Sequence, residues 1–467
     1  MSLRILIALN FAAVATLFFL RNRRRPFRIL DPAWAFLGGY FMNYCVRPAV
    51  YLFDPDAASF YKETLNTDSA LRAGLPGALL FAMIGFLGFA VGDLYCQRMA
   101  WSVSRCLPTA DLGRLAKSRS YLTAKLLLGA AGVLGLWGFI HDTGWSGSVL
   151  ELLTGFQRDT FLGVIFGHGY WTFAMQLSIV GWALMCAQWI AYPNAWRGWR
   201  RVAFAMWRYA WLIISVLVWV AFGERSAILT VIFVPFAIFV TVKSLGTNKV
   251  GQNILPRRAW ILALLFMIIA GPVGLLMKQK EVTTSAIVGM AISAWDSMEF
   301  TVAANDQLGF RDLFWGRSYV SDILYTWYPR TLFPNKPERY GAVLLQDRLA
   351  PDLMEFPNAT FPPGILVEAY ANFWYVGLFV VPLLLAVFCR AVYFRIQARD
   401  VFWIVQMALF FPQLASFRSL GWEFAALFAN LLVLALVIVL CRVASFLAFS
   451  PLPGPLRTRE AQPNPGY

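Results

Sequence analysis

Residues 3–28, LRILIALNFAAVATLFFLRNRRRPFR, place a long apolar run directly before a cluster of arginines. The run, about residues 3–20, is long enough to cross the hydrocarbon core of a bilayer as a helix. No small-residue cleavage site follows it, so it does not resemble a cleaved signal peptide. We expect it to be a transmembrane helix, with the arginines on the cytoplasmic side of the membrane.

Segments of the same kind recur along the whole chain. The protein has 467 residues, of which 59% are hydrophobic, and its mean hydropathy is +0.60, far above that of a soluble domain. Eleven apolar runs approach or exceed roughly 18 residues, the length of a membrane span. They cover about 3–20, 33–53, 75–96, 122–140, 170–192, 205–222, 226–242, 259–277, 366–388, 401–417 and 424–446. The sequence therefore predicts an all-α polytopic membrane protein with about 11 transmembrane helices.

The distribution of charge predicts the orientation of these spans. With residues 21–28 in the cytoplasm and alternation through eleven spans, the cytoplasmic side carries 25 Lys and Arg against 5 Asp and Glu. The opposite side carries 15 against 20. This asymmetry is the positive-inside pattern of membrane proteins. The net charge of +15 thus reflects topology, and we expect no nucleic-acid partner.

We expect a single membrane domain over residues 1–467, ending in a disordered cytoplasmic tail at 448–467. The six cysteines all fall in spans or on the cytoplasmic side, so no disulfide framework is expected. With two histidines and no Cys/His cluster, a structural zinc site is not expected either. We predict a function without metal or cofactor.

The longest outward segment, residues 278–365, is the one candidate subdomain. Apolar residues recur at helical spacing from Ile287 to Val302, which predicts an amphipathic helix on the membrane surface or capping the bundle. The polar face of this helix would carry Asp296, Glu299, Asn305 and Asp306. Seven prolines between 329 and 363 then break any long helix, which predicts an extended path with short helices. We expect this periplasmic loop to form part of an active-site wall.

Polar residues at the outer ends of spans are the strongest functional signal. They are Glu224, Arg225, Glu368, Asn372, Arg418 and Glu423. Charges at such depth are costly unless they are paired or face a water-filled cavity, so a shared outer site is the default hypothesis. Snorkelling, or an internal ion pair such as Glu224 with Arg418, is the structural alternative.

Six of the 15 cations on the face that the positive-inside pattern leaves acidic are candidates for binding a phosphate: Arg225, Arg317, Arg330, Lys336, Arg339 and Arg418. The guanidinium group donates in a planar fork that matches phosphate oxygens. A diphosphate at the outer leaflet would account for these cations. The neighbouring aromatic residues Tyr325, Trp327, Tyr328 and Tyr340 suit either an interfacial belt or a sugar-stacking platform.

Four motifs follow in order on this face: GERSAIL (223–229), YPRTLFPNKP (328–337), PPGILVEAYANFWYVG (362–377) and the late Arg418. This pattern resembles the polytopic oligosaccharide repeat-unit polymerases of O-antigen and exopolysaccharide assembly, the Wzy family. The resemblance covers about residues 220–425. It implies a GT-C-like or O-antigen ligase-like bundle in a bacterial inner membrane, with the active site facing the periplasm.

Carried over by position, the family pattern places Arg225, Lys336, Glu368 and Asn372 in the site. The chain departs from the pattern at Trp374, where a small residue is expected. The resemblance implies undecaprenyl-diphosphate-linked oligosaccharides as donor and acceptor. It also implies the lipid bilayer and a chain-length regulator as partners.

The implied reaction is glycosyl transfer with a diphosphate leaving group. Such a leaving group needs charge neutralisation more than protonation, so arginines can take the place of a metal ion. The acceptor hydroxyl needs a general base. Glu368, one helical turn from Asn372, is the first candidate, and His168 in GHGY is the second. A structural ion pair with Arg330 or Arg339 is the alternative role for Glu368.

Two other functions stay open. A ligase that moves glycan onto lipid A–core or another acceptor would differ from a polymerase only in its acceptor. A lipid-oligosaccharide flippase would need charged or broken helices near the bilayer midplane, and Arg47 and Gly271-Pro272 are the features in its favour. Asp54-Pro-Asp56 has the spacing of a metal-binding DxD motif, but we interpret it as a helix-ending turn.

Overall fold

The computed structural model describes residues 3–24, 30–53, 68–108, 119–142, 169–191, 233–241, 297–325, 333–337, 339–351 and 363–448, with isolated residues between 202 and 231. Every regular element in these ranges is a helix, which confirms the all-α prediction there. Four helices are long and apolar enough to cross a membrane: α1 (Leu3–Arg24), α5 (Asp68–Tyr95), α19 (Ile365–Gln397) and α21 (Leu420–Ala448). The count of eleven spans stays a prediction, since the run at 259–277 lies outside the described residues.

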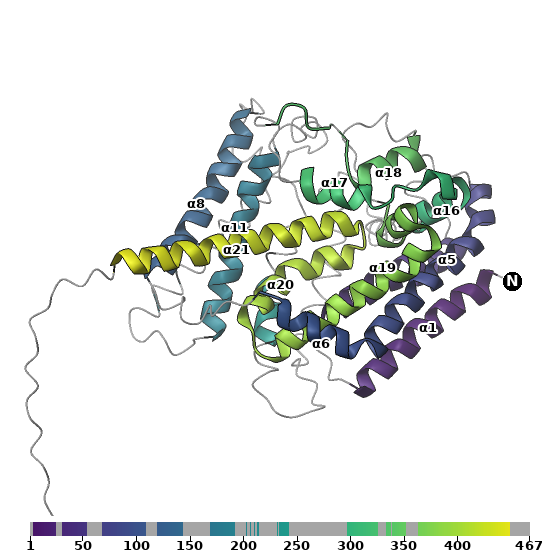
Figure 1. The fold of residues 1–467 in the computed structure, drawn as a ribbon, viewed down its shortest axis with the longest axis horizontal. Helices are drawn as coiled ribbons and strands as arrows, with labels where there is room; N and C mark the ends of the chain where they lie inside the picture. Colours follow the sequence, from purple (N-terminus) through teal and green to yellow (C-terminus); the bar gives the residue numbers. More distant parts are fainter. Residues whose placement is uncertain are drawn as a thin grey trace, which may run out of the picture.

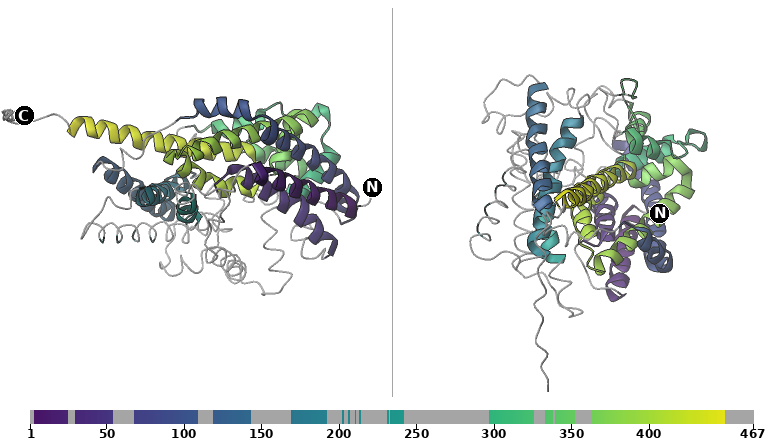
Figure 2. Two further views of the ribbon diagram at one scale, coloured as in Figure 1. Left: turned by 90° about the horizontal axis from the view of Figure 1, so that it is seen from below. Right: turned by 60° about the vertical axis from the view of Figure 1, so that its left-hand side comes forward.

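The remaining helices are α2 (Pro32–Phe41), η1 (Met42–Val46), α3 (Arg47–Phe53), α6 (Gln97–Cys106), α8 (Arg119–Asp142), α11 (Gly169–Ala191), α16 (Ser297–Gln307), η2 (Phe310–Asp312), α17 (Arg317–Tyr325), α18 (Ala342–Leu349) and α20 (Val401–Ser416). In Figure 1, α1, α5 and α19 lie side by side, while α8 and α11 form a second pair. Helices α20 and α21 connect these two groups, and α16 to α18 gather near the start of α19 (Figures 1 and 2).

Close packing of α5 on α19 depends on glycines along one face of α5. A Cβ added to Gly88 or Gly92 would overlap the backbone carbonyl of Phe379 or Leu383. The pair α8 and α11 is built in the same way, since a Cβ at Gly135 would lie 2.9 Å from the carbonyl oxygen of Trp171. Small residues at helical spacing let backbones approach closely inside membranes.

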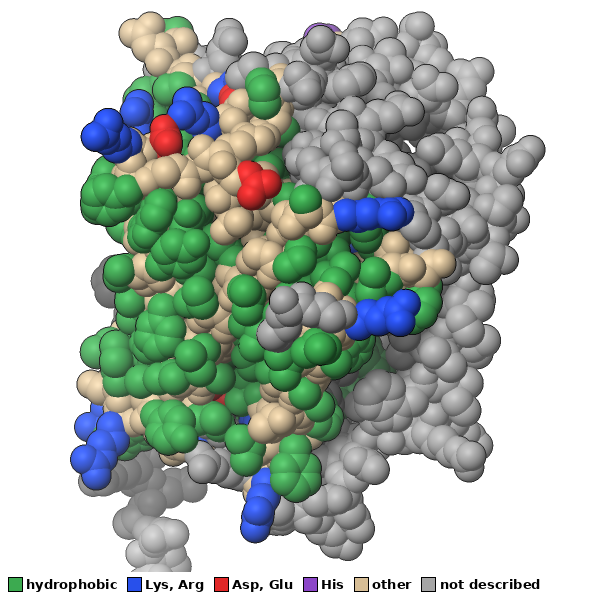
Figure 3. All heavy atoms as spheres, turned by 90° about the vertical axis from the view of Figure 1, so that its right-hand side faces the viewer, with side chains coloured by type: hydrophobic (Ala, Val, Ile, Leu, Met, Phe, Trp, Pro, Cys, Tyr) green, Lys and Arg blue, Asp and Glu red, His purple; other side chains and the backbone are tan. Residues whose placement is uncertain are grey.

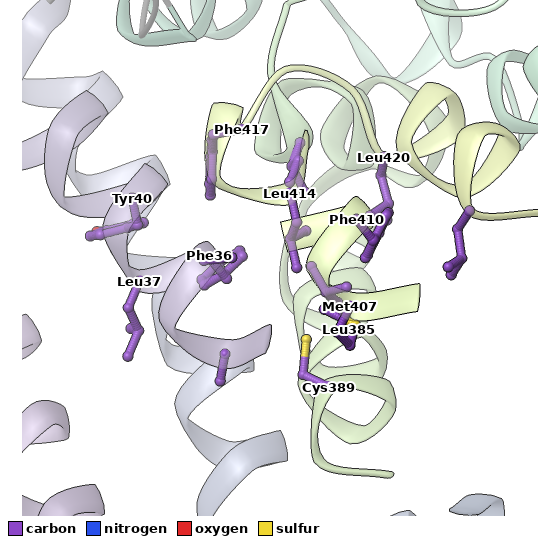
Figure 4. Close-up of a cluster of buried hydrophobic side chains, with 14 of the residues drawn as sticks. Phe36, Leu37, Tyr40, Leu385, Cys389, Met407, Phe410, Leu414, Phe417 and Leu420 are labelled. Atoms are coloured by element: carbon purple, nitrogen blue, oxygen red, sulfur yellow. The ribbon is translucent and has the colours of Figure 1, made fainter. Parts of the chain in front are cut away.

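A cluster of buried apolar side chains joins the short helix α2 to the later helices. Phe36 points towards residues of α19 and α20, among them Leu385 and Leu414, whereas Leu37 lies on the other side of α2 (Figure 4). Phe36 also stacks on Phe89 of α5, with ring centroids 3.9 Å apart. The buried α2 therefore acts as a central packing element, although it has only 10 residues.

The outer surface is also apolar. Figure 3 shows one face with a broad hydrophobic band; Lys and Arg side chains lie at its upper and lower ends, and others stand along its right-hand edge. Phe19 on α1, Leu87 on α5 and Val376 on α19 are all more than half exposed. An apolar patch of this extent would be a liability in water. The surface is compatible with a membrane protein whose apolar band contacts lipid.

Helix α16 docks on η1 and α3 through three polar contacts. Arg47 Nε donates to Glu299 Oε1 at 2.6 Å, Ser297 N donates to Asn43 Oδ1 at 3.0 Å, and the Tyr44 hydroxyl lies 2.9 Å from Thr301 Oγ1. Arg47 and Glu299 are both buried. Helix α16 therefore ties the large predicted loop to the first part of the chain.

Two sequence predictions need correction here. The prediction that Glu299 lies on the polar face of a surface helix is wrong. Helix α16 buries residues 297–304, and the Glu299 carboxylate pairs with Arg47. The upstream part of that predicted helix, 287–296, lies outside the described residues. Arg47 is half of an ion pair and no longer supports a flippase. The short helices expected in residues 278–365 are present in the described part of the loop: α17 precedes Pro329, and α18 lies between Pro337 and Pro351.

Removing one partner of the buried Arg47–Glu299 pair should destabilise the protein. In Glu299→Leu, the buried guanidinium loses its carboxylate, which typically costs about 3–5 kcal/mol. Breaking the exposed Arg348–Asp312 pair by Arg348→Met should cost at most about 1 kcal/mol. Thermal unfolding in detergent micelles checks the contrast. Equal losses in the two variants would contradict it, and Arg47→Met/Glu299→Leu should recover most of the stability.

Candidate active site

The start of α19 is fixed by the residue before it. Gly364 has a φ of 103°, a backbone conformation that favours glycine, and a Cβ there would overlap Ser297 of α16. The amide of Ile365 then donates to the carbonyl of Phe417, at the end of α20, at 3.4 Å. The junction of α16, α19 and α20 therefore sets the direction in which the first turn of α19 projects Glu368.

The Glu368 carboxylate is fully buried and accepts four hydrogen bonds. Oε1 accepts from Ser318 Oγ at 3.1 Å, and Oε2 accepts from Ser419 Oγ at 3.1 Å, Leu420 N at 2.6 Å and Gly421 N at 3.2 Å. The two amides belong to the first residues of α21. A helix start leaves such N–H groups without intrahelical partners and favours an anion. Glu368 thus caps α21 from another part of the chain.

The structural alternative for Glu368, an ion pair with Arg339, is wrong. The Arg339 guanidinium pairs with Asp347 in the same loop. Arg330, the other proposed partner, lies outside the described residues. Neutral donors from α17 and α21 hold the carboxylate instead. Sequence reasoning missed them because Ser318 and Ser419 lie about fifty residues before and after Glu368.

Asn372 shares a partner with Glu368, as their helical spacing predicts. Its Nδ2 donates to Ser318 Oγ at 2.6 Å and to the backbone oxygen of Glu368 at 2.8 Å. Its Oδ1 is buried and has no hydrogen-bond partner within the described part of the chain, and the hydroxyl of Tyr319 is in the same situation. Buried polar atoms without partners are costly, so both atoms are suited to binding a ligand.

Helix α19 is broken directly after Asn372. The φ and ψ of Trp374 are 59° and −156°, a conformation that strongly favours glycine. This geometry gives a physical reason for the small residue that the family resemblance leads one to expect at this position. Here the Trp374 ring stacks on Tyr370 instead, with centroids 5.2 Å apart. The backbone amide of Trp315 donates to the freed carbonyl of Asn372 at 3.1 Å.

The break separates the site from the longer part of α19. Residues 375–397 form about 35 Å of helix, enough to cross a hydrocarbon core of about 30 Å. The segment that carries Glu368 and Asn372 is therefore a short helix at one end of the span. A transporter would instead place its broken helices and charges near the bilayer midplane.

A second buried carboxylate, Asp322 of α17, lies beside Glu368. It accepts a hydrogen bond from Ala342 N at 3.1 Å. A Cβ added to Gly421 would lie 2.7 Å from Asp322 Oδ2 and 3.0 Å from Glu368 Oε1, so the two carboxylates converge over this glycine. Burial, and then the nearby Glu368 charge, raises the pKa of Asp322 from 3.8 to about 8. Burial and the neighbouring carboxylate therefore both favour the protonated form of Asp322.

Two exposed arginines stand at the edge of the acid pair. Arg317 precedes Ser318 and Arg418 precedes Ser419, the two serines that donate to Glu368. The segments RSYVSD (317–322) and RSLGWE (418–423) both place a buried acid five residues after the arginine. Each segment contributes one cation to the surface and one serine to the buried carboxylate. Each exposed arginine is therefore one residue away from a serine that donates to the buried Glu368 carboxylate.

The structure places the other predicted site residues as follows. The Lys336 ammonium lies over the ring of Tyr340, 4.8 Å from its centroid, and Arg339 pairs with Asp347. Both cations therefore have partners within the loop, and neither is among the hydrogen-bond partners of Glu368 described above. Glu224, Arg225, His168, Tyr328 and Arg330 lie outside the described residues, and their roles stay predictions. Asp322, Ser318, Ser419 and Gly421 join the site although the sequence did not single them out.

Comparison with known protein families, curated proteins and solved structures found no match to this chain. A helical membrane fold can host many activities, so its architecture does not decide the function. The function has to be argued from the chemistry of the Glu368 site.

Gly421→Ala should destabilise the protein, although alanine has a higher helix propensity than glycine. Gly→Ala inside a helix usually stabilises by about 0.5–1 kcal/mol. At Gly421 the new Cβ would lie only 2.7 Å from Asp322 Oδ2, so the acid pair would have to move. Gly38→Ala is the control, because nothing lies within 4 Å of its added Cβ. If Gly421→Ala melts at or above the wild-type temperature, the convergence of the carboxylates is refuted.

Asp322 should make stability depend on pH. Its raised pKa means that folding favours the protonated form. The stability from this group is complete below pH 3.8 and is lost as pH rises through about 8. Asp322→Asn cannot ionise but still offers an oxygen to Ala342 N. The melting temperature of the wild type relative to Asp322→Asn should fall between about pH 5 and about pH 8. A constant difference would contradict the assignment.

Proposed function

We propose that the protein is a metal-independent glycosyltransferase that polymerises undecaprenyl-diphosphate-linked oligosaccharide repeat units on the periplasmic face of a bacterial inner membrane. The observation that carries the proposal is a buried acid pair, Glu368 and Asp322, with two exposed arginines at its edge. The ordered motifs that resemble the repeat-unit polymerases support the same assignment. Substrate and membrane side both follow from this resemblance and from the charge asymmetry of the sequence.

The two arginines suit the leaving group of this reaction. When the glycosidic carbon–oxygen bond breaks, its electron pair passes to the diphosphate oxygen, and negative charge grows there. Arg317 and Arg418 can each donate in a fork to phosphate oxygens and neutralise that charge. With its charge neutralised in this way, the leaving group needs no separate acid. Arg225 is a further candidate for the same role.

The acid pair suits the other half of the reaction. The acceptor hydroxyl must lose its proton as its oxygen bonds to the anomeric carbon. Ser318 Oγ donates to Glu368 and accepts from Asn372 Nδ2, which leaves one of its two lone pairs for a substrate proton. The proton can pass to this oxygen while the serine proton moves to Glu368. Asn372 Oδ1 and the Tyr319 hydroxyl can then orient sugar hydroxyl groups.

A ligase differs from a polymerase in its acceptor, and a flippase differs in needing access to both sides of the membrane. A ligase would use the same donor site, so this chemistry describes it equally well. A flippase has less support, because Arg47 is paired with Glu299 and the break in α19 lies at the end of its span. The proposed activity uses groups that gather at one end of the bundle.

Glu368→Gln should stop polymerisation without unfolding the protein. The glutamine oxygen can still accept from Leu420 N and Gly421 N, but the side chain cannot take a proton. Cells that carry only this variant should accumulate single-repeat lipid-linked units on the periplasmic leaflet, measured by glycan chain length and by accessibility to added glycosidase. Asp312→Asn, in an exposed ion pair of the same loop, should behave as wild type.

Long polymer at the wild-type rate in Glu368→Gln would place the base elsewhere, and His168→Ala would be the next variant to measure. Accumulation of the single units on the cytoplasmic leaflet would instead indicate a flippase and would refute the proposed reaction.

A further inference from the structure

Helix α17 turns its polar side chains inward and its apolar side chains outward. Ser318, Ser321 and Asp322 are at most 8% exposed, whereas Val320, Ile323 and Leu324 are 56%, 38% and 46% exposed. A helix on the surface of a water-soluble domain has the opposite arrangement. The outer face of α17 is therefore suited to an apolar contact, while its inner face completes the site around Glu368.

Helix α17 contacts the first turns of α21, and α21 also has an exposed apolar surface. Large exposed side chains follow one another along α21 at Trp422, Phe428, Leu432, Leu436, Val439 and Val443. From the first to the last of these, the helix rises about 30 Å, which matches the hydrocarbon thickness of a bilayer. Trp422 would then lie at one boundary of the membrane. The outer face of α17 lies at the level of the same boundary.

Positive charge lies at the same end. Arg317 is the first residue of α17, and Arg418 lies two residues before the start of α21; both are exposed. A ligand with an anionic head and a long apolar tail fits this combination. A phospholipid could cover the apolar surface, but it has no need of two cations beside a buried acid pair. A diphosphate with an isoprenoid tail can use both parts.

We infer that the outer face of α17 and the exposed stripe of α21 bind the isoprenoid chain of the lipid-linked substrate. The diphosphate lies at Arg317 and Arg418, and the glycan extends towards Glu368. This arrangement rests on the proposed function for the chemical identity of the lipid. It explains why an amphipathic helix with an outward apolar face is part of the wall of a polar site.

Photo-crosslinking tests the inference directly. We would place p-benzoylphenylalanine at Leu324 and, as a matched control, at Leu384 of α19, which is exposed to almost the same extent. The protein would be held in phosphatidylcholine nanodiscs that contain undecaprenyl diphosphate, and adducts would be identified by mass spectrometry. Position 324 should yield several-fold more isoprenoid adduct than position 384. This excess should disappear in Arg317→Gln/Arg418→Gln.

Equal isoprenoid yields at the two positions, or phosphatidylcholine adducts alone at position 324, would overturn the inference. As a second measurement, Ile323→Ser/Leu324→Ser should bind undecaprenyl diphosphate roughly tenfold more weakly, since apolar area is lost from the contact. Leu384→Ser should bind as wild type does. All three residues are at least partly exposed, so the substitutions test binding and leave the core intact.

The outcome can be separated from that of the proposed function, because undecaprenyl diphosphate carries no glycan and its binding needs no turnover. Polymerisation with equal crosslinking at both positions would refute the lipid path and leave the polymerase assignment intact. Selective crosslinking at position 324 without any polymerisation would support the lipid path and refute the polymerase.

Discussion

The structure depends on one buried anion, the Glu368 carboxylate. Removing such a group from water is expensive unless hydrogen bonds replace those of the solvent. Here four donors do so, and they come from α17 and from the start of α21, while the carboxylate itself belongs to α19. Satisfying this one group therefore requires that three segments meet. The same requirement brings Asp322 and the two exposed arginines to one place.

The capping role of Glu368 is compatible with a chemical role. Ser419 Oγ accepts from Trp422 N at 3.3 Å, so serine and glutamate together satisfy the first three amides of α21. The two amides that donate to Glu368 both use Oε2. Among the described residues, the hydrogen-bond partner of Oε1 is the Ser318 hydroxyl alone. One oxygen anchors the helix, and the other is left for exchange of a proton. A fixed carboxylate with one adaptable partner is suited to a general base.

Sequence patterns predicted the local features of this protein and missed the pairings between distant segments. Hydrophobic run length predicted α1, α5, α19 and α21, and helical spacing predicted that Glu368 and Asn372 share a face. Arg47 and Glu299 are 252 residues apart, and periodicity carries no information about such a partner. Gly421 looked unremarkable for the same reason, since only the fold brings Asp322 to it. The glycine spacing of α5 was a readable signal for close helix packing.

The two faces of α17 follow from where this helix lies. Its inner face offers a hydroxyl donor to a carboxylate, which suits serine. Its outer face lies beside the start of α21, a helix long and apolar enough to cross a membrane, which favours valine, isoleucine and leucine. A helix of nine residues that satisfies both conditions necessarily links an apolar surface to a polar site. A lipid tail on the outer face would be separated from the reacting groups by only the width of one helix, about 10 Å. That distance suits a substrate whose tail is lipid and whose head undergoes the reaction.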